Sequence, residues 1–217
     1  MTKVYKLVVV FAVVLLLPTN APSAPVDDSR SWEFSVLLDG SEIGYHRYEL
    51  LERGGMQEIR SEASFDVRFL FVTAFRYRHS NRELWADDGC LSRIESNTRQ
   101  NSDRLSVQGA RVGDVFQLET ADRTDTLSEC VMTFAYWNPD FLEQQMLLNP
   151  QSGEYLPVQV EPLGMQPVTV RGQQVDAHAY RLKAEKVELT VWYSNDDEWL
   201  GLESVARGGR IIRYELV

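Results

Sequence analysis

The sequence predicts an all-β protein, mainly an antiparallel meander that forms a strongly curved sheet or half-barrel with one short helix near 139–148. Hydrophobic and polar residues alternate with a period of two from Ser31 to Asn138, and no stretch there keeps the helical period for long. Turn residues recur roughly every 10–12 residues, too often for βαβ units. About a dozen strands would curl or partly close rather than stay flat.

The first hairpin shows this pattern most clearly. Apolar residues occupy every second position from Trp32 to Leu38. Asp39-Gly40 then predicts a tight turn, because both central positions of a type I′ turn need a positive φ. Further strands are expected at 43–51, 59–71, 75–85, 90–98, 105–110, 115–120, 155–161, 168–170, 175–182, 187–193, 199–206 and 211–217.

One interruption of the alternation predicts the helix. Asn138 is a good N-cap, and Pro139 suits the first helical position. Asp140 would lie in the first turn, where a carboxylate interacts favourably with the helix dipole. Apolar residues at 141, 142, 146 and 147 would line one side of a helix that ends near Asn149-Pro150.

The composition is that of a folded protein: of 217 residues, 44% are hydrophobic and 25% are charged. The net charge of −10 argues against binding to nucleic acid. Residues 31–217 contain no linker rich in Pro, Gly or Ser, so a single β domain is expected there.

The N-terminus predicts export. Lys3 and Lys6 precede an apolar run from Leu7 to Leu17, and small residues follow, which together have the anatomy of a signal peptide over residues 1–23. An uncleaved membrane anchor is the alternative, although the run is short for one. Residues 24–30 are expected to be a disordered N-terminal segment. No cysteine lies near the cleavage site, so a periplasmic or secreted protein without a lipid anchor is predicted.

Export changes the interpretation of the two cysteines. Cys90 and Cys130 would be free thiols in the cytosol, but in an oxidising compartment they are expected to form one disulfide. The chain has no C-x-x-C motif that would suggest a redox role.

The motif search finds no H-E-x-x-H, no phosphate-binding loop and no dinucleotide-binding glycine pattern, so no catalytic residue, cofactor or metal is predicted. The histidines lack the spacing of metal ligands and are expected to be isolated strand residues. A site built from converging strands, with Asp66 or Asp176 as a further ligand, is the alternative. The histidines concerned are His46, His79 and His178.

Asp196-Asp197-Glu198 is expected to be a charged turn.

Two groups of residues are candidates for ligand contact. Phe134, Tyr136 and Trp137 precede the predicted helix and would form a rigid aromatic loop that either contacts an apolar ligand or plugs the core. Arg68 and Arg76 lie on consecutive predicted strands. Facing inward they would meet an acidic head group; facing outward, an arginine beside Asp66 would form a solvated pair.

Several phrases of the sequence occur together: Trp32-Glu33-Phe34, Leu38-Asp39-Gly40, Ile43-Gly44-Tyr45-His46, Phe65-Asp66-Val67-Arg68, Tyr136-Trp137-Asn138-Pro139, Gly153-Glu154 and Leu189-Thr190-Val191-Trp192-Tyr193-Ser194. In this combination the chain resembles a family of secreted bacterial proteins defined only as a domain of unknown function. The resemblance covers nearly the whole mature chain and implies no activity. The expected architecture is similar to periplasmic lipid- or lipoprotein-carrier half-barrels, an analogy of shape alone.

The leading hypothesis is therefore an exported envelope protein that binds a lipid or other apolar or amphipathic small molecule in its concave face, without catalysis. An assembly protein that pairs with an envelope partner through an edge strand such as 211–217 is the first alternative. A hydrolase-type enzyme that depends on Asp66, His46 or His79 is the second.

Overall fold

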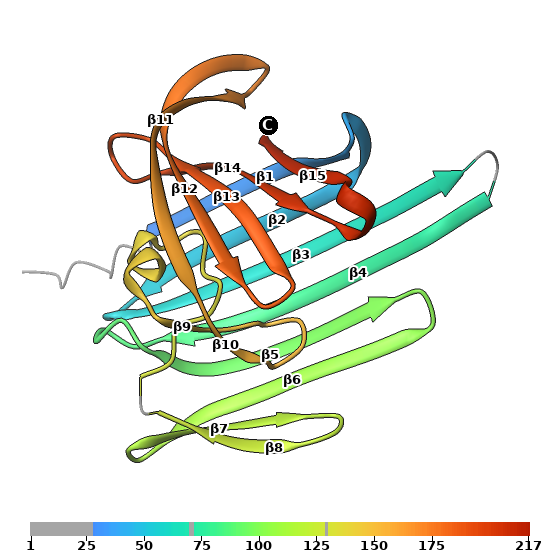
Figure 1. Cartoon of the computed structure of the whole chain (residues 1–217). Coiled ribbons are helices and arrows are strands. Elements are labelled where there is room, and N and C mark those ends of the chain that lie inside the picture. Colours follow the sequence, from blue (N-terminus) through green and yellow to red (C-terminus); the bar gives the residue numbers. More distant parts are fainter. Residues whose placement is uncertain (1–27, 70–71, 129) are drawn as a thin grey trace, which may run out of the picture.

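The computed structural model describes residues 28–69, 72–128 and 130–217. The first meander is formed by β1 (Asp28–Leu38), β2 (Ser41–Arg53), β3 (Met56–Phe69), β4 (Val72–Trp85), β5 (Leu91–Gln100), β6 (Asp103–Val112), β7 (Val115–Thr120) and β8 (Thr124–Leu127). The second meander is formed by β11 (Gln159–Val170), β12 (Gln173–Ala184), β13 (Val187–Tyr193), β14 (Trp199–Val205) and β15 (Ile211–Leu216), with the 3₁₀ turn η2 (Arg207–Gly209) before β15. The prediction of an all-β, curved antiparallel fold is confirmed (Figure 1).

The predicted signal peptide lies outside the described residues, as do residues 24–27 of the N-terminal segment. Residues 28–30, expected to be disordered, instead extend β1. They pair with Leu50, Leu51 and Glu52 of β2, whose backbone would otherwise lose these partners.

The last strand joins the two meanders into one 13-stranded sheet in the order β11-β12-β13-β14-β15-β1-β2-β3-β4-β5-β6-β7-β8. The C-terminal strand was expected to be an edge, and that prediction is wrong: β15 pairs with β14 on one side and with β1 on the other. One further pairing, Val170 with Leu216, brings β11 back to β15, so the second meander curls almost into a closed ring. The outermost strands are β8, which is four residues long, and β11, which carries Pro162 and Pro167. Short or proline-bearing edges are poor templates for pairing with another chain.

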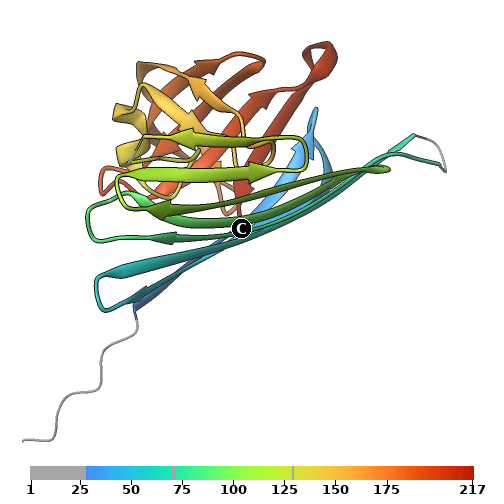
Figure 2. The same cartoon turned by 90° about the horizontal axis from the view of Figure 1, so that it is seen from below.

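The plug segment (residues 130–158) lies between the meanders. It contains η1 (Pro139–Glu143), β9 (Met146–Leu148) and β10 (Tyr155–Pro157). Figure 2 shows the plug segment and the second meander on the same side of the first meander. Apolar side chains from all three parts form one core cluster, whose largest fully buried members include Trp85, Trp199, Tyr193, Phe34 and Phe116.

The predicted helix at 139–148 is instead a 3₁₀ turn of five residues, η1, followed by the strand β9 at 146–148. Asn138 caps the turn by accepting a hydrogen bond from the Asp140 amide, as expected for that residue. The backbone becomes extended at Gln144, the C-cap of η1, and Leu147 and Leu148 are then fully buried in β9. The amide of Leu148 donates to Met132 O at 2.8 Å, so burial and sheet pairing outweigh the local preference for helix.

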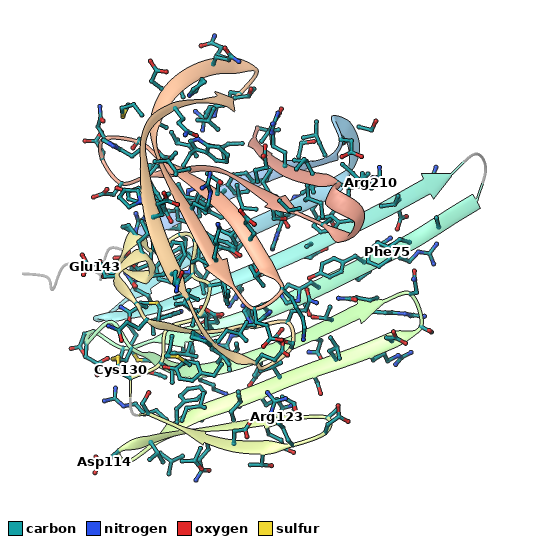
Figure 3. The ribbon with its side chains drawn as sticks, in the orientation of Figure 1. Phe75, Asp114, Arg123, Cys130, Glu143 and Arg210 are labelled. Carbon is teal, nitrogen blue, oxygen red and sulfur yellow. A yellow bond between two sulfur atoms is a disulfide. The ribbon has the colours of Figure 1, made fainter. Side chains whose placement is uncertain are left out.

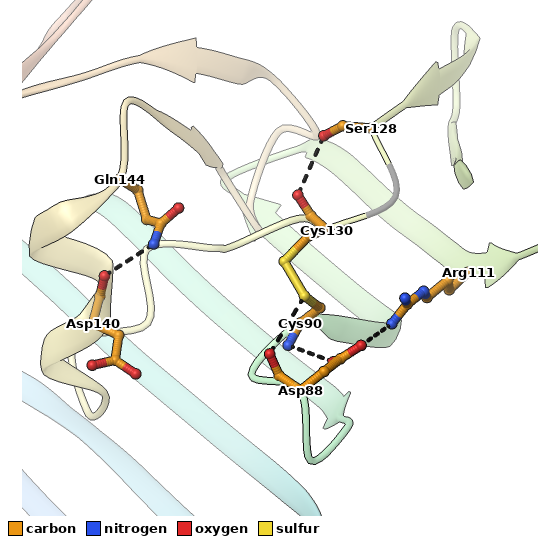
Figure 4. Close-up of a disulfide and its surroundings, with 7 residues drawn as sticks. All are labelled: Asp88, Cys90, Arg111, Ser128, Cys130, Asp140 and Gln144. Carbon is orange, nitrogen blue, oxygen red and sulfur yellow. Dashed lines mark hydrogen bonds and ion pairs between the residues drawn. A yellow bond between two sulfur atoms is a disulfide. The ribbon is translucent and has the colours of Figure 1, made fainter. Parts of the chain in front are cut away.

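The predicted disulfide between Cys90 and Cys130 is present (Figure 4). Cys90 follows the turn after β4, where its amide donates to Asp88 Oδ1 at 3.0 Å. Directly after the bond, Leu91 N donates to Val131 O at 3.0 Å. The disulfide therefore attaches the start of the plug segment to the first meander.

We expect the double substitution Cys90→Ser and Cys130→Ser to lower the free energy of unfolding. The bond closes a loop with a sequence separation of 40 residues, for which chain entropy predicts a loss of about 4 kcal/mol. Urea denaturation with and without reductant measures it. The double variant should be insensitive to reductant, and an unchanged midpoint in reduced wild-type protein would contradict the prediction.

Gly44 of β2 allows an unusually close approach of two strands. It lies beside a register shift between β1 and β2 and opposite Phe65 of β3. A Cβ at this position would lie 1.9 Å from Ser64 O, and the φ of +153° is one that side-chain-bearing residues rarely adopt. By contrast, Gly164 in β11 has a φ of +77° with open space around it.

We therefore expect Gly44→Ala to cost about 3 kcal/mol of stability or more. The matched variant Gly164→Ala should cost about 1–2 kcal/mol, because only its φ is unfavourable. Both are measured by urea denaturation. Equal losses would show that the close approach at Gly44 has no energetic weight.

Candidate functional site

A cavity of about 200 Å³ lies between the inner face of the first meander and the plug segment. Its floor comes from β2, β3 and β4, and its other walls from the plug segment, the start of β13 and β15. Figure 3 shows that side chains crowd the space between the two meanders. The lining residues are His46, Tyr48, Ile59, Ser61, Tyr77, His79, Asn81, Glu83, Thr133, Phe134, Ala135, Tyr136, Trp137, Asn149, Pro150, Gln151, Val187 and Tyr214.

The period of two places a polar row on the inner face of β4. Tyr77, His79, Asn81 and Glu83 occupy alternate positions of that strand and all line the cavity. The register aligns each with a residue of β3; Asn81, for example, lies opposite Ser61. Most inward positions of a sheet like this one are apolar, so a run of polar residues on the inner face indicates a candidate functional site.

Glu83 is the one acid among the described residues that line the cavity, and 2% of its surface is exposed. Three side chains hydrogen-bond to it: Asn81 Nδ2 at 2.8 Å, Trp85 Nε1 at 3.1 Å and Thr133 Oγ1 at 3.2 Å. Burial raises the pKa of the Glu83 carboxyl to about 7, and the three hydrogen bonds offset part of that effect. The carboxyl therefore titrates near neutral pH.

The two histidines of the site are neutral at pH 7. Burial lowers the pKa of His46 well below its usual value, with a smaller contribution from His79, and burial lowers the pKa of His79 to about 4. His79 Nδ1 lies 2.8 Å from Thr98 Oγ1, and His46 Nδ1 lies 3.2 Å from the Tyr48 hydroxyl. Two buried atoms of the lining, His46 Nε2 and Asn81 Oδ1, have no hydrogen-bond partner among the described residues.

The plug segment brings the predicted aromatic residues to the cavity. Phe134, Tyr136 and Trp137 all line it, and all three also contact the core. Trp137 packs edge-to-face on Trp85 with 5.6 Å between ring centroids, and Tyr136 O accepts a hydrogen bond from Tyr193 at 2.6 Å. The loop is therefore held rigidly where both of its expected roles, core plug and ligand contact, are geometrically compatible.

The structure does not bring the predicted arginines to these aromatic residues. Arg76 lies opposite Asp66 on the outer face of the β3–β4 hairpin and pairs with it at 3.5 Å; Arg78 pairs with the same carboxylate at 2.8 Å. Arg68 is exposed near the same end of β3. Phe75, next to Arg76, lies far from Cys130 and Glu143 of the plug segment (Figure 3). Arg76 and Asp66 thus form an outward-facing pair on the sheet surface, which is the second of the two arrangements considered from the sequence.

The remaining candidates lie elsewhere. His178 is half-buried, with Nε2 3.1 Å from Asn195 Oδ1. Asp196, Asp197 and Glu198 form a turn, with Ser194 Oγ accepting hydrogen bonds from two of their amides. In the part of the chain that the structure describes, no group of three His, Cys, Asp or Glu side chains could hold a metal ion.

Sequence reasoning missed Glu83, Asn81 and Ser61. The available signal was the polar run at alternate positions of one predicted strand, 75–85, where inward residues are expected to be apolar. The period of two does not by itself say which of the two faces is inside, so the run could not be placed in a cavity.

The comparisons with known proteins address the fold. A family model described as "Domain of unknown function (DUF6134)" matches residues 34–217. The chain belongs to this DUF6134 family. A search of the curated proteins finds no match. Among solved structures, the DUF6134 chain is similar to a β-barrel-like protein of the domain of unknown function DUF1849 from Brucella abortus, with a TM-score of 0.62 and 10% sequence identity, covering 86% of this chain and 94% of that chain.

That likeness shows a shared β-barrel-like fold for the DUF6134 chain and says nothing about its cavity. Within the described ranges, none of the helices is long and apolar enough to cross a membrane. The disulfide is the kind of bond that forms in an oxidising compartment.

The pKa of Glu83 predicts how stability depends on pH. Its folded-state value of about 7 lies above the ordinary 4.5, so between these values the folded protein binds more protons than the unfolded chain. The protonated Glu83 carboxyl therefore adds to the free energy of unfolding. This contribution is complete below about pH 4.5 and is lost as pH rises through 7. Over this pH range we expect the free energy of unfolding of the wild-type protein to fall by about 3 kcal/mol relative to that of Glu83→Gln.

Urea denaturation of both proteins at pH 5 and pH 8 measures this difference. The comparison with Glu83→Gln is needed because His79 acts with the opposite sign: its lowered pKa gives stability that is present above pH 6.5 and lost as pH falls toward 4. Both proteins contain His79, so its effect cancels. A difference that does not change with pH would contradict the prediction.

Proposed function

We propose that this protein is an exported envelope protein that binds a small amphipathic molecule in the cavity between the first meander and the plug segment, without catalysing a reaction on it. The observation that carries the proposal is the cavity itself, which combines an aromatic wall with buried polar atoms that lack partners. Such a combination is typical of small-molecule sites, where apolar contact supplies affinity and a few polar groups orient the ligand.

The size of the cavity supports a small ligand. A cavity of about 150 Å³ is enough to hold benzene, and this one is about 200 Å³. Phe134, Tyr136 and Trp137 would contact the apolar part of the molecule. A long acyl chain would exceed the space, so the expected ligand is ring-sized rather than a whole lipid.

The unpartnered atoms support a polar group on the same molecule. A buried donor or acceptor without a hydrogen bond costs about 1–3 kcal/mol. A ligand that bonds to His46 Nε2 and Asn81 Oδ1 would remove that cost. Export is supported by the predicted signal peptide and by the disulfide.

Native mass spectrometry of the protein, exported through its own N-terminal segment and gently purified, tests the proposal. We expect a discrete added mass that organic solvent removes. Ser61→Leu, which places a larger side chain in the cavity, should abolish it. Ser80→Leu makes the same exchange at an exposed position of β4 and should retain it. A bare wild-type mass, or an adduct that survives Ser61→Leu, would overturn the proposal.

A further inference from the structure

We propose that the ligand of this cavity is a small organic cation, a protonated amine that carries one ring or a short apolar group, with Glu83 as its counter-charge and the surrounding aromatic rings as its walls. This inference rests on the proposed function and names the ligand class. It replaces an acidic head group, which the sequence suggested, with a basic one.

The charges of the lining favour a cation. The described residues around the cavity include one acid, Glu83, and neither Lys nor Arg. His46 and His79 are neutral at pH 7, for the reason given above. The cavity thus holds one half of an ion pair. A carboxylate ligand would place two like charges together, whereas an ammonium group would supply the missing partner in surroundings where water screens little.

The hydrogen bonds already made by Glu83 point the same way. Trp85 Nε1 can only donate, and Asn81 Nδ2 is also a donor. Both Glu83 oxygens therefore accept hydrogen bonds, Oε1 from Asn81 and Oε2 from Trp85. This arrangement is suited to the ionised carboxylate, which burial alone disfavours. A bound cation would remove that conflict.

The unpartnered atoms match the donors of an ammonium group. Asn81 Oδ1 can only accept a hydrogen bond. His46 is 8% exposed, and its Nε2 is an acceptor when Nδ1 carries the proton and donates to the Tyr48 hydroxyl. An ammonium group has three N–H donors and no acceptor. Asn81 Oδ1 and the Glu83 carboxylate, whose side chains are already joined by a hydrogen bond of 2.8 Å on β4, would receive two of them, and His46 Nε2 is a further acceptor of the lining for another polar hydrogen of the ligand.

The walls of the cavity are rich in aromatic rings from both sides. Tyr48, Tyr77 and Tyr214 come from three strands of the sheet, and Tyr136 and Trp137 come from the plug segment. Ring faces attract cations, and most strongly in sites from which water is excluded. Burial raises the pKa of the four tyrosines, so their rings carry neutral hydroxyls at pH 7. The net charge of −10 also favours the approach of cations.

Three probes of nearly equal size and different charge test the inference. Benzylamine is cationic at pH 7.5, benzyl alcohol is neutral and benzoate is anionic. Isothermal titration calorimetry of the full-length mature protein should show benzylamine binding at least about tenfold more tightly than benzyl alcohol, with no detectable binding of benzoate. In Glu83→Gln the preference for benzylamine should disappear while benzyl alcohol still binds.

Glu95→Gln is the matched control, because it removes the same charge from β5 outside the cavity lining, where the side chain is 42% exposed, and should keep the preference. Thermal unfolding verifies that each variant is folded. If Glu83→Gln does not fold, Tyr136→Leu replaces it, and its loss of affinity should be larger for benzylamine than for benzyl alcohol.

Two results would overturn the inference and leave the proposed function standing: equal binding of benzylamine and benzyl alcohol to wild-type protein, or unchanged benzylamine affinity in Glu83→Gln. Absence of binding by all three probes would also overturn it. The native adduct and its loss in Ser61→Leu then decide the proposed function separately, since that experiment uses none of these probes.

Discussion

Pairing of β15 on both of its sides holds this fold together. On one side it continues the second meander from β14, and on the other it pairs with β1 from Phe34 to Leu38. The strand thereby closes a chain of contacts between the last residues of the sequence and the first described ones. Without it, the two meanders would be separate open sheets with unpaired edges and no common inner space.

The plug segment fills part of that space and leaves a cavity between itself and the curved sheet. It is attached to the first meander by the disulfide, by Thr133 bonded to Glu83, and by the Tyr77 hydroxyl, which donates to Gln151 at 2.9 Å. Two of these attachments use side chains of the cavity itself. Packing of the plug segment and the arrangement of the polar floor are therefore coupled, and a rigid site results.

The polar row of β4 is the place where the chain departs from the rule that inward residues of such a sheet are apolar. The buried carboxyl of Glu83, the buried His79 and the unpartnered amide oxygen of Asn81 on β4, with the buried His46 of β2 beside them, all disfavour the empty protein. Departures of this kind are expected at functional sites, where residues needed for function lower the local stability. The DUF1849 structure shares the fold of this chain, but the two sequences are only 10% identical. The properties of the cavity must therefore be argued from the side chains of this chain.

Local sequence patterns were enough to predict most of the strands and their turns, the capped turn at Asn138 and the partners of the disulfide. These features depend on local alternation, on residues suited to particular backbone angles, and on the two cysteines being the only ones in the chain. Long-range contacts were needed to form the strands β8 and β9, to make β15 internal, and to turn Glu83 inward and Arg76 outward. Periodicity says that two faces differ, but the choice of the inner face and of the neighbouring strand depends on which distant segments bury each other's apolar surface.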